Sequence, residues 1–221
     1  MLEVSLNEIE SLALKSVRGA GFYWGMAEEA ARAARWLAAR GLPWAGSLAA
    51  ILEANAAGRL GGFAWSGTDV VSESAGLESC PIRGGACLCD FSAVLPRLVL
   101  PRLCQPLWLL PFVDTTANLI GAPIGLLWSD DQMIVGPNGT IGVDAQSVQN
   151  LSMAPRADLT VELEIAEADN LPMEIWPRRA AVCAVPESDW RRLQHFERLT
   201  YVPASETSRL SGAGAGFKDS D

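Results

Sequence analysis

The chain has 221 residues, of which 49% are apolar and 19% are charged, and 26 acidic against 17 basic residues give it a formal net charge of −9. This composition argues against a disordered chain, and an acidic chain without a concentrated basic face is a poor candidate for nucleic-acid binding. The length suits one domain, or one domain with a small helical appendage.

The N-terminal quarter of the chain predicts three helices. A capping-box pattern at Ser5–Glu8 precedes apolar residues at helical spacing. Glycines and a proline then mark the ends of the periodic segments. We therefore expect helices from Ser5 to just before Gly19, roughly from Met26 to Arg40, and from near Pro43 to Gly58.

The period changes after Gly58. Residues 60–92 are rich in Gly, Ser and Cys and give no long periodic signal, whereas the prolines within Val94–Val113 favour buried extended segments with bends. The patterns that follow predict a three-stranded meander over residues 124–128, 132–135 and 140–143. They then predict a half-buried strand over 159–165, a short buried strand over 180–185 and a helix over 186–199.

Helices followed by hairpin-linked strands indicate an α+β fold with a mostly antiparallel sheet. We expect an N-terminal helical segment over residues 1–58 and a sheet domain with a C-terminal helix over 59–199. A Gly-rich tail, docked rather than frayed, is expected over 200–221.

The first residues contain neither the basic nor the apolar region of a signal peptide, and no apolar run reaches the ~20 residues of a membrane helix. The number of cysteines, five, is odd. We therefore expect a cytoplasmic protein with reduced thiols and no membrane or nucleic-acid partner.

Cysteines 80, 87 and 89 form the first candidate site. Cys87 and Cys89 would share a face if their segment were a strand, which makes Cys87 a candidate nucleophile. A structural role and a metal or redox role stay open, although C-x-C lacks the partner pair that a zinc site needs, so no metal site is predicted. The sequence identifies no cofactor.

Two other residues are candidates for acid–base chemistry. His195 is the only histidine and lies in a charged helix, where an exposed position is equally consistent with the pattern. Asp114 follows an apolar segment and is expected at a strand end that faces a pocket, because such ends often carry function.

The C-terminal residues combine an aromatic side chain, an arginine and a run of alternating Gly and Ala. The run is no dinucleotide loop, because no strand precedes it and no helix follows. We expect Tyr201, Arg209, Gly212 and Gly214 to contact a ligand or a partner.

Several motifs at both ends of the chain resemble the DUF3726 family, a bacterial family of uncharacterised function. They are Ser5–Glu10, Arg18–Gly21, Trp24–Ala30, Arg35–Leu37, Thr200–Glu206, Ser208–Arg209 and the run at 212–216. The helix spacing and Arg40–Leu42 are also similar to the N-terminal helices of the malate/L-lactate dehydrogenase (Ldh2-like) family. Ala45 stands where that family has its catalytic histidine, so this resemblance transfers no catalytic residue.

Three functions remain open from the sequence. The first is an enzyme, or enzyme component, that acts on a small anionic, carboxylate-bearing metabolite, with Arg83 and Arg209 as candidate ligands of the carboxylate. The second is a non-catalytic accessory or regulatory subunit whose tail docks on a partner. The third is a structural homo-oligomer.

Overall fold

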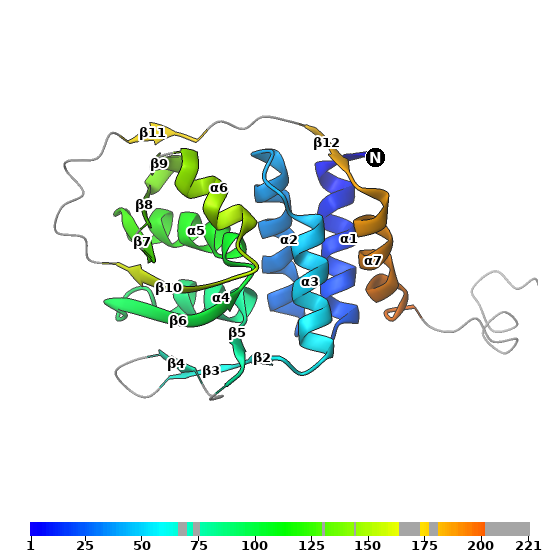
Figure 1. Ribbon diagram of the computed structural model, residues 1–221, viewed down its shortest axis with the longest axis horizontal. Coiled ribbons are helices and arrows are strands. Elements are labelled where there is room, and N and C mark those ends of the chain that lie inside the picture. The colour runs from blue at the N-terminus through cyan, green and yellow to red at the C-terminus, as the bar shows by residue number, and fades with distance from the viewer. Residues whose placement is uncertain are drawn as a thin grey trace, which may run out of the picture.

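The computed structural model of the chain describes residues 1–65, 70–72, 76–129, 131–143, 145–163, 173–176 and 181–201. Its fold is α+β, with N-terminal helices, an antiparallel sheet and a C-terminal helix, as the sequence predicts. Figure 1 shows a group of helices beside a sheet that carries its own helices.

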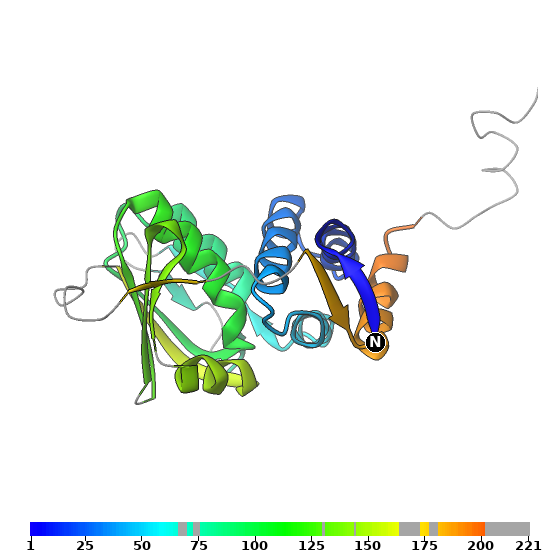
Figure 2. The same cartoon turned by 90° about the horizontal axis from the view of Figure 1, so that it is seen from above.

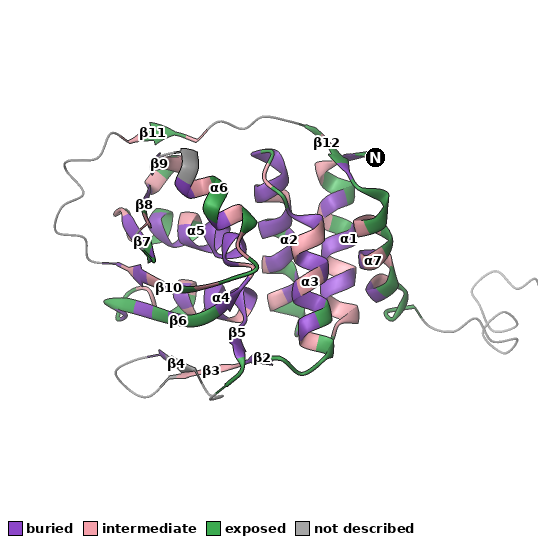
Figure 3. Ribbon diagram, viewed as in Figure 1, coloured by how far each residue is buried: buried purple, intermediate pink, exposed green. Residues whose placement is uncertain are grey.

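The first three helices form where the sequence predicts them. They are α1 (Leu6–Gly19), α2 (Trp24–Ala39) and α3 (Ala45–Ala56). The capping box at the start of α1 is confirmed: the amide of Ser5 donates to Glu8 Oε2 at 2.8 Å, and the amide of Glu8 donates to Ser5 Oγ at 3.3 Å. The apolar faces of these helices are buried against one another (Figure 3).

The C-terminal helix α7 (Glu187–Arg198) packs on α1 and α3, far along the chain from both. The Ser16 hydroxyl donates to the carbonyl of Leu193 at 2.8 Å, and Lys15 pairs with Glu197 at 3.1 Å. Figure 2 shows α7 on the side of the helical group that lies away from the six-stranded sheet.

Strand β12 (Val182–Val185) leads into α7 and pairs antiparallel with β1 (Leu2–Ser5), a strand that the sequence does not reveal. The predicted strand is confirmed over Val182–Val185, but its predicted burial is wrong, because only Val185 of its four residues is buried. A two-stranded sheet at the edge of the molecule leaves the other three at least partly open to solvent.

The main sheet has six strands in the order β11-β9-β8-β7-β10-β6, and its recorded pairs are antiparallel. The predicted meander is confirmed, with Ile124 opposite Val135 and Trp128 opposite Asp131. The strands are β6 (Arg97–Cys104), β7 (Ile124–Trp128), β8 (Asp131–Gly136), β9 (Thr140–Gly142), β10 (Arg156–Glu162) and β11 (Glu174–Ile175).

Two helices cover the face of this sheet that is turned toward the helical group (Figure 2), and the sequence predicted neither. They are α4 (Pro81–Phe91) and α5 (Leu110–Ile120). Paired glycines hide the period of α4, although close packing requires them, since a Cβ at Gly85 would lie 2.3 Å from the ring of Phe112. The prolines near the start of α5 suggested bends, but proline is well tolerated in the first turn of a helix.

Short elements complete the described chain. Strands β2 (Leu60–Gly61) and β5 (Glu78–Ser79) pair in parallel, and β3 (Phe63–Trp65) pairs antiparallel with β4 (Val70–Ser72). Two 3-10 turns and a further helix are η1 (Pro106–Leu109), η2 (Pro137–Gly139) and α6 (Ala145–Met153). Across the described ranges, every helix is too short or too polar to cross a bilayer.

Candidate functional site

Helices α2, α4 and α5 surround a pocket of about 330 Å³, at the place where the helical group meets the sheet and its helices. We call it the Trp36 pocket. Its volume lies at the lower end of the range for small-molecule sites. Its polar lining residues are Glu29, Arg32, Cys89, Asp90 and Thr115. Its larger apolar lining residues are Trp36, Pro111, Phe112 and Leu119.

One face of α2 supplies a wall of the pocket. Glu29, Arg32 and Trp36 are three and four residues apart, and this spacing places them on one side of a helix. Between them lie the small alanines that let α2 pack closely on its neighbours. Arg32 is exposed at the rim, and within the described residues no ion pair includes it.

The indole of Trp36 contacts Asp114, Trp176 and Arg40, the residue that caps the end of α2. Its Nε1–H donates to Asp114 Oδ2 at 2.8 Å, and the Arg40 guanidinium lies 3.7 Å from the ring centroid. Trp176 meets the ring edge-on, with 5.3 Å between centroids. These contacts fix the orientation of the wall that Trp36 presents to the pocket.

Glu29 is an acidic pocket residue whose pKa is raised. Burial raises the pKa of its carboxyl, and the negative charges of Asp90 and Glu28 raise it further, while Arg32 opposes them. Glu29 Oε2 is buried and has no hydrogen-bond partner within the described residues. A carboxyl in this setting keeps its proton to a higher pH than an ordinary glutamate.

The cysteines do not have the electrostatic setting of a nucleophile. Burial, and then the charge of Asp90, raise the pKa of Cys87 to about 11, whereas reactive thiols have lowered values. Burial also raises the pKa of Cys89, whose Sγ lies 3.4 Å from the Thr116 hydroxyl. The idea that Cys87 and Cys89 share a strand face is wrong, because both lie on α4, where residues two apart point in different directions.

Asp114 does not stand at a strand end, as the sequence suggested, but within α5. There its Oδ2 accepts from Trp36, while its Oδ1 is buried without a partner among the described residues. Asp114 therefore adjoins the Trp36 pocket as the group that orients the indole.

The other candidates of the sequence lie apart from this pocket. Arg83, on α4, donates to Asn55 at 2.8 Å and stacks over the ring of Phe22. His195 is exposed on α7, and the Tyr201 hydroxyl donates to Glu197 at 2.7 Å. Arg209, Gly212 and Gly214 lie outside the described residues.

Sequence reasoning missed Glu29, Arg32 and Trp36, which line the pocket from α2 together with Ala33. Their only signal is that a glutamate, an arginine and a tryptophan recur at helical spacing in an alanine-rich helix. A solvated helix face has the same pattern, so the signal becomes specific only when α4 and α5 are known to lie opposite.

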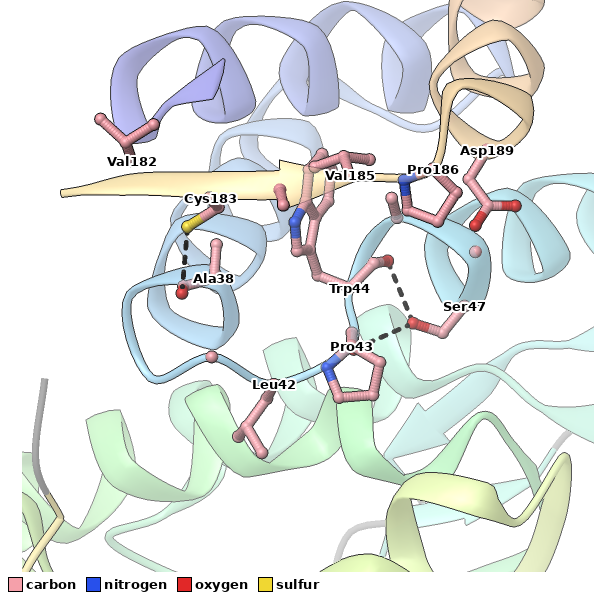
Figure 4. Close-up of a pocket in the computed structure, with 14 residues that line it drawn as sticks. Ala38, Leu42, Pro43, Trp44, Ser47, Val182, Cys183, Val185, Pro186 and Asp189 are labelled. Atoms are coloured by element: carbon pink, nitrogen blue, oxygen red, sulfur yellow. Dashed lines mark hydrogen bonds between the residues drawn. The ribbon is translucent and has the colours of Figure 1, made fainter. Parts of the chain in front are cut away.

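A larger pocket, of about 520 Å³, lies between β12 and residues 41–47 (Figure 4). Its lining is mostly apolar and its polar side chains are engaged within the protein. The Cys183 thiol donates to the carbonyl of Ala38 at 3.3 Å, Ser47 donates to that of Trp44 at 3.0 Å, and Asp189 accepts from Arg192 at 3.0 Å. The smaller Trp36 pocket is the better candidate, because within the described part of the chain Arg32 is in no ion pair and Glu29 Oε2 has no hydrogen-bond partner.

Comparisons with known proteins identify one similarity. Residues 4–80 match the family model DUF3726, described as a protein of unknown function. The match spans α1, α2 and α3, and hence the α2 wall of the Trp36 pocket, but not the C-terminal motifs quoted above. No curated protein and no solved structure matches, so the similarity to the malate/L-lactate dehydrogenase family has no support. Over residues 4–80, therefore, the chain is similar to DUF3726.

Proposed function

We propose that the protein binds a small carboxylate-bearing metabolite in the Trp36 pocket, as an enzyme or as a component of one. The observation that carries the proposal is Arg32, an arginine at the rim of a pocket with no acidic partner among the described residues. Arginine binds carboxylates in a two-pronged geometry, and an unpaired guanidinium is available to do so.

We propose that Arg32, rather than Arg83, binds the carboxylate of the metabolite. The Arg83 guanidinium already bonds Asn55 and covers the Phe22 ring, whereas Arg32 lines the pocket directly. If the protein is catalytic, Glu29 is the group best suited to exchange a proton with the ligand, because its pKa is raised and it lines the same pocket. Asp114 then acts as a positioning residue through Trp36.

The test is a screen of small carboxylates against the full-length protein, observed by NMR through the indole N–H resonance of Trp36. A Trp36→Phe variant assigns that resonance. We expect at least one carboxylate to shift it in a saturable way and Arg32→Gln to weaken the binding about tenfold or more. Arg35→Gln, a matched control, removes a cation that pairs with Glu10 outside the pocket and should leave binding unchanged. A library in which no carboxylate shifts Trp36 would refute the proposal.

A second candidate function is that of an accessory subunit or homo-oligomer, and an exposed aromatic groove favours it. The groove, of about 540 Å³, lies between α1, the start of α2 and the end of α7. Trp24 and Tyr201 line it with exposed fractions of 59% and 55%, and the cations Lys15 and Arg18 lie near their rings. Exposed aromatic groups of this kind are enriched in protein interfaces.

Light scattering after size-exclusion chromatography tests the homo-oligomer. We expect a mass above that of one chain, and a shift toward the monomer in the Trp24→Ser variant. A wild-type protein that stays monomeric at high concentration would exclude the homo-oligomer.

A further inference from the structure

Two opposite charges on one turn of α2 face the Trp36 pocket without pairing. Glu29 and Arg32 are three residues apart, a spacing at which acidic and basic side chains commonly interact on a helix surface. No ion pair or hydrogen bond joins them, although they are close enough for Arg32 to influence the pKa of Glu29. Each charge is therefore available to pair with an oppositely charged group of a bound ligand.

Two other arginines on the helices do pair with carboxylates. The next arginine on α2, Arg35, donates to Asn7 at 2.6 Å and to Glu10 at 3.1 Å. On α7, Arg192 bonds both Glu53 and Asp189. Both of these arginines pair with carboxylates, whereas Arg32 is in no ion pair among the described residues, and Glu29 Oε2, like Asp114 Oδ1 and Arg83 Nη1, is buried there without a hydrogen-bond partner.

We propose that the ligand of the Trp36 pocket is a zwitterion, a free amino acid with an apolar side chain. Arg32 binds its carboxylate, Glu29 binds its ammonium group, and its side chain packs on the apolar wall that includes Phe112 and Leu119. The inference rests on the proposed function, since it specifies the chemical class of the metabolite in the same pocket.

Electrostatics favours a zwitterion over a simple anion or cation. A lone carboxylate that binds Arg32 approaches Glu29 and Asp90, which both line the pocket, so it meets repulsion as well as attraction. A lone amine satisfies these acids but leaves Arg32 without a counter-charge. A zwitterion satisfies both signs, and the short distance between its charges suits two side chains about 5–6 Å apart at their Cβ atoms.

Matched ligands test this inference. The full-length protein is titrated calorimetrically with L-leucine and L-phenylalanine. It is then titrated with their analogues that lack the amino group, 4-methylpentanoate and 3-phenylpropanoate, and with those that lack the carboxylate, 3-methylbutylamine and 2-phenylethylamine. We expect at least one of the two amino acids to bind about tenfold more tightly than both of its analogues, because each analogue leaves one pocket charge unpaired.

Variants assign the charges to their residues. Glu29→Gln and Arg32→Gln should each weaken amino-acid binding about tenfold, whereas Arg35→Gln should not change it. The Trp36 indole resonance should shift with the amino acid in the wild-type protein, which places the ligand in this pocket.

Two results would overturn the inference. If the carboxylates without an amino group bind as tightly as the amino acids and Glu29→Gln has no effect, the pocket binds simple carboxylates, and the proposed function stands without its zwitterion. If neither amino acid binds, the zwitterion is excluded, and the wider carboxylate screen then decides the proposed function by itself.

Discussion

Trp36→Phe tests how the pocket wall is held in place. Phenylalanine keeps an aromatic ring beside Arg40 and Trp176 but removes the Nε1–H that donates to Asp114 Oδ2 at 2.8 Å. Because Asp114 Oδ1 already lacks a partner among the described residues, the variant leaves the whole carboxylate without its recorded donor. Loss of a hydrogen bond to a partly buried charged acceptor costs about 1–3 kcal/mol of unfolding free energy.

Urea denaturation followed by circular dichroism measures this cost, and a double-mutant cycle with Asp114→Ala isolates the pair. We expect a coupling energy of about 1–2 kcal/mol, and a fall in Tm of roughly 3–8 °C for Trp36→Phe alone. Trp190→Phe is the matched control, since the Trp190 indole makes no hydrogen bond within the described residues. If Trp36→Phe costs no more than Trp190→Phe and the coupling is close to zero, Asp114 does not hold the pocket wall.

Three further predictions follow from the same structure. Gly85→Ala should destabilise the protein by about 1–3 kcal/mol in urea denaturation, because its Cβ would lie 2.3 Å from the ring of Phe112, whereas Gly25→Ala, with nothing within 4 Å, should not. A bulky thiol reagent at pH 7 should modify fewer than five cysteines in the native protein, since burial raises the pKa of every cysteine thiol; rapid modification of all five would contradict this. Glu29→Gln should raise Tm at pH 8, because the raised pKa of Glu29 means that its ionised form opposes folding. The gain should shrink as the pH falls through the raised pKa of Glu29 and vanish below the ordinary glutamate pKa of 4.5, and a gain that does not change with pH would refute the reasoning.

Much of the fold is predictable from the sequence because its signals are local. The capping box of α1 lies within four residues, and the alternation in β10 and the turns of the meander depend on near neighbours. Helix α4 was missed because glycine disfavours a helix locally, and the reason for Gly85 is the close packing of the Phe112 ring, which is distant in the sequence. Strand β1 was missed because its partner, β12, is about 180 residues away and only the fold brings the two together.

The candidate site was less predictable for the same physical reason. The sequence predicts Asp114 as an acid that faces a pocket, whereas in the structure it accepts a hydrogen bond from Trp36, a pocket residue 78 positions earlier. Neither Arg32 nor Glu29 belongs to a motif that indicates binding, because what sets them apart is that Arg32 has no ion pair and Glu29 Oε2 no hydrogen-bond partner among the described residues. That property depends on which helices lie opposite α2.

The most direct test of the account is a crystal structure of the full-length protein grown with L-leucine or L-phenylalanine. The account predicts ligand density in the Trp36 pocket, with the carboxylate about 3 Å from the Arg32 guanidinium and the ammonium group at the same distance from Glu29. Density for the ligand in the pocket beside β12, with the Trp36 pocket holding solvent alone, would contradict it.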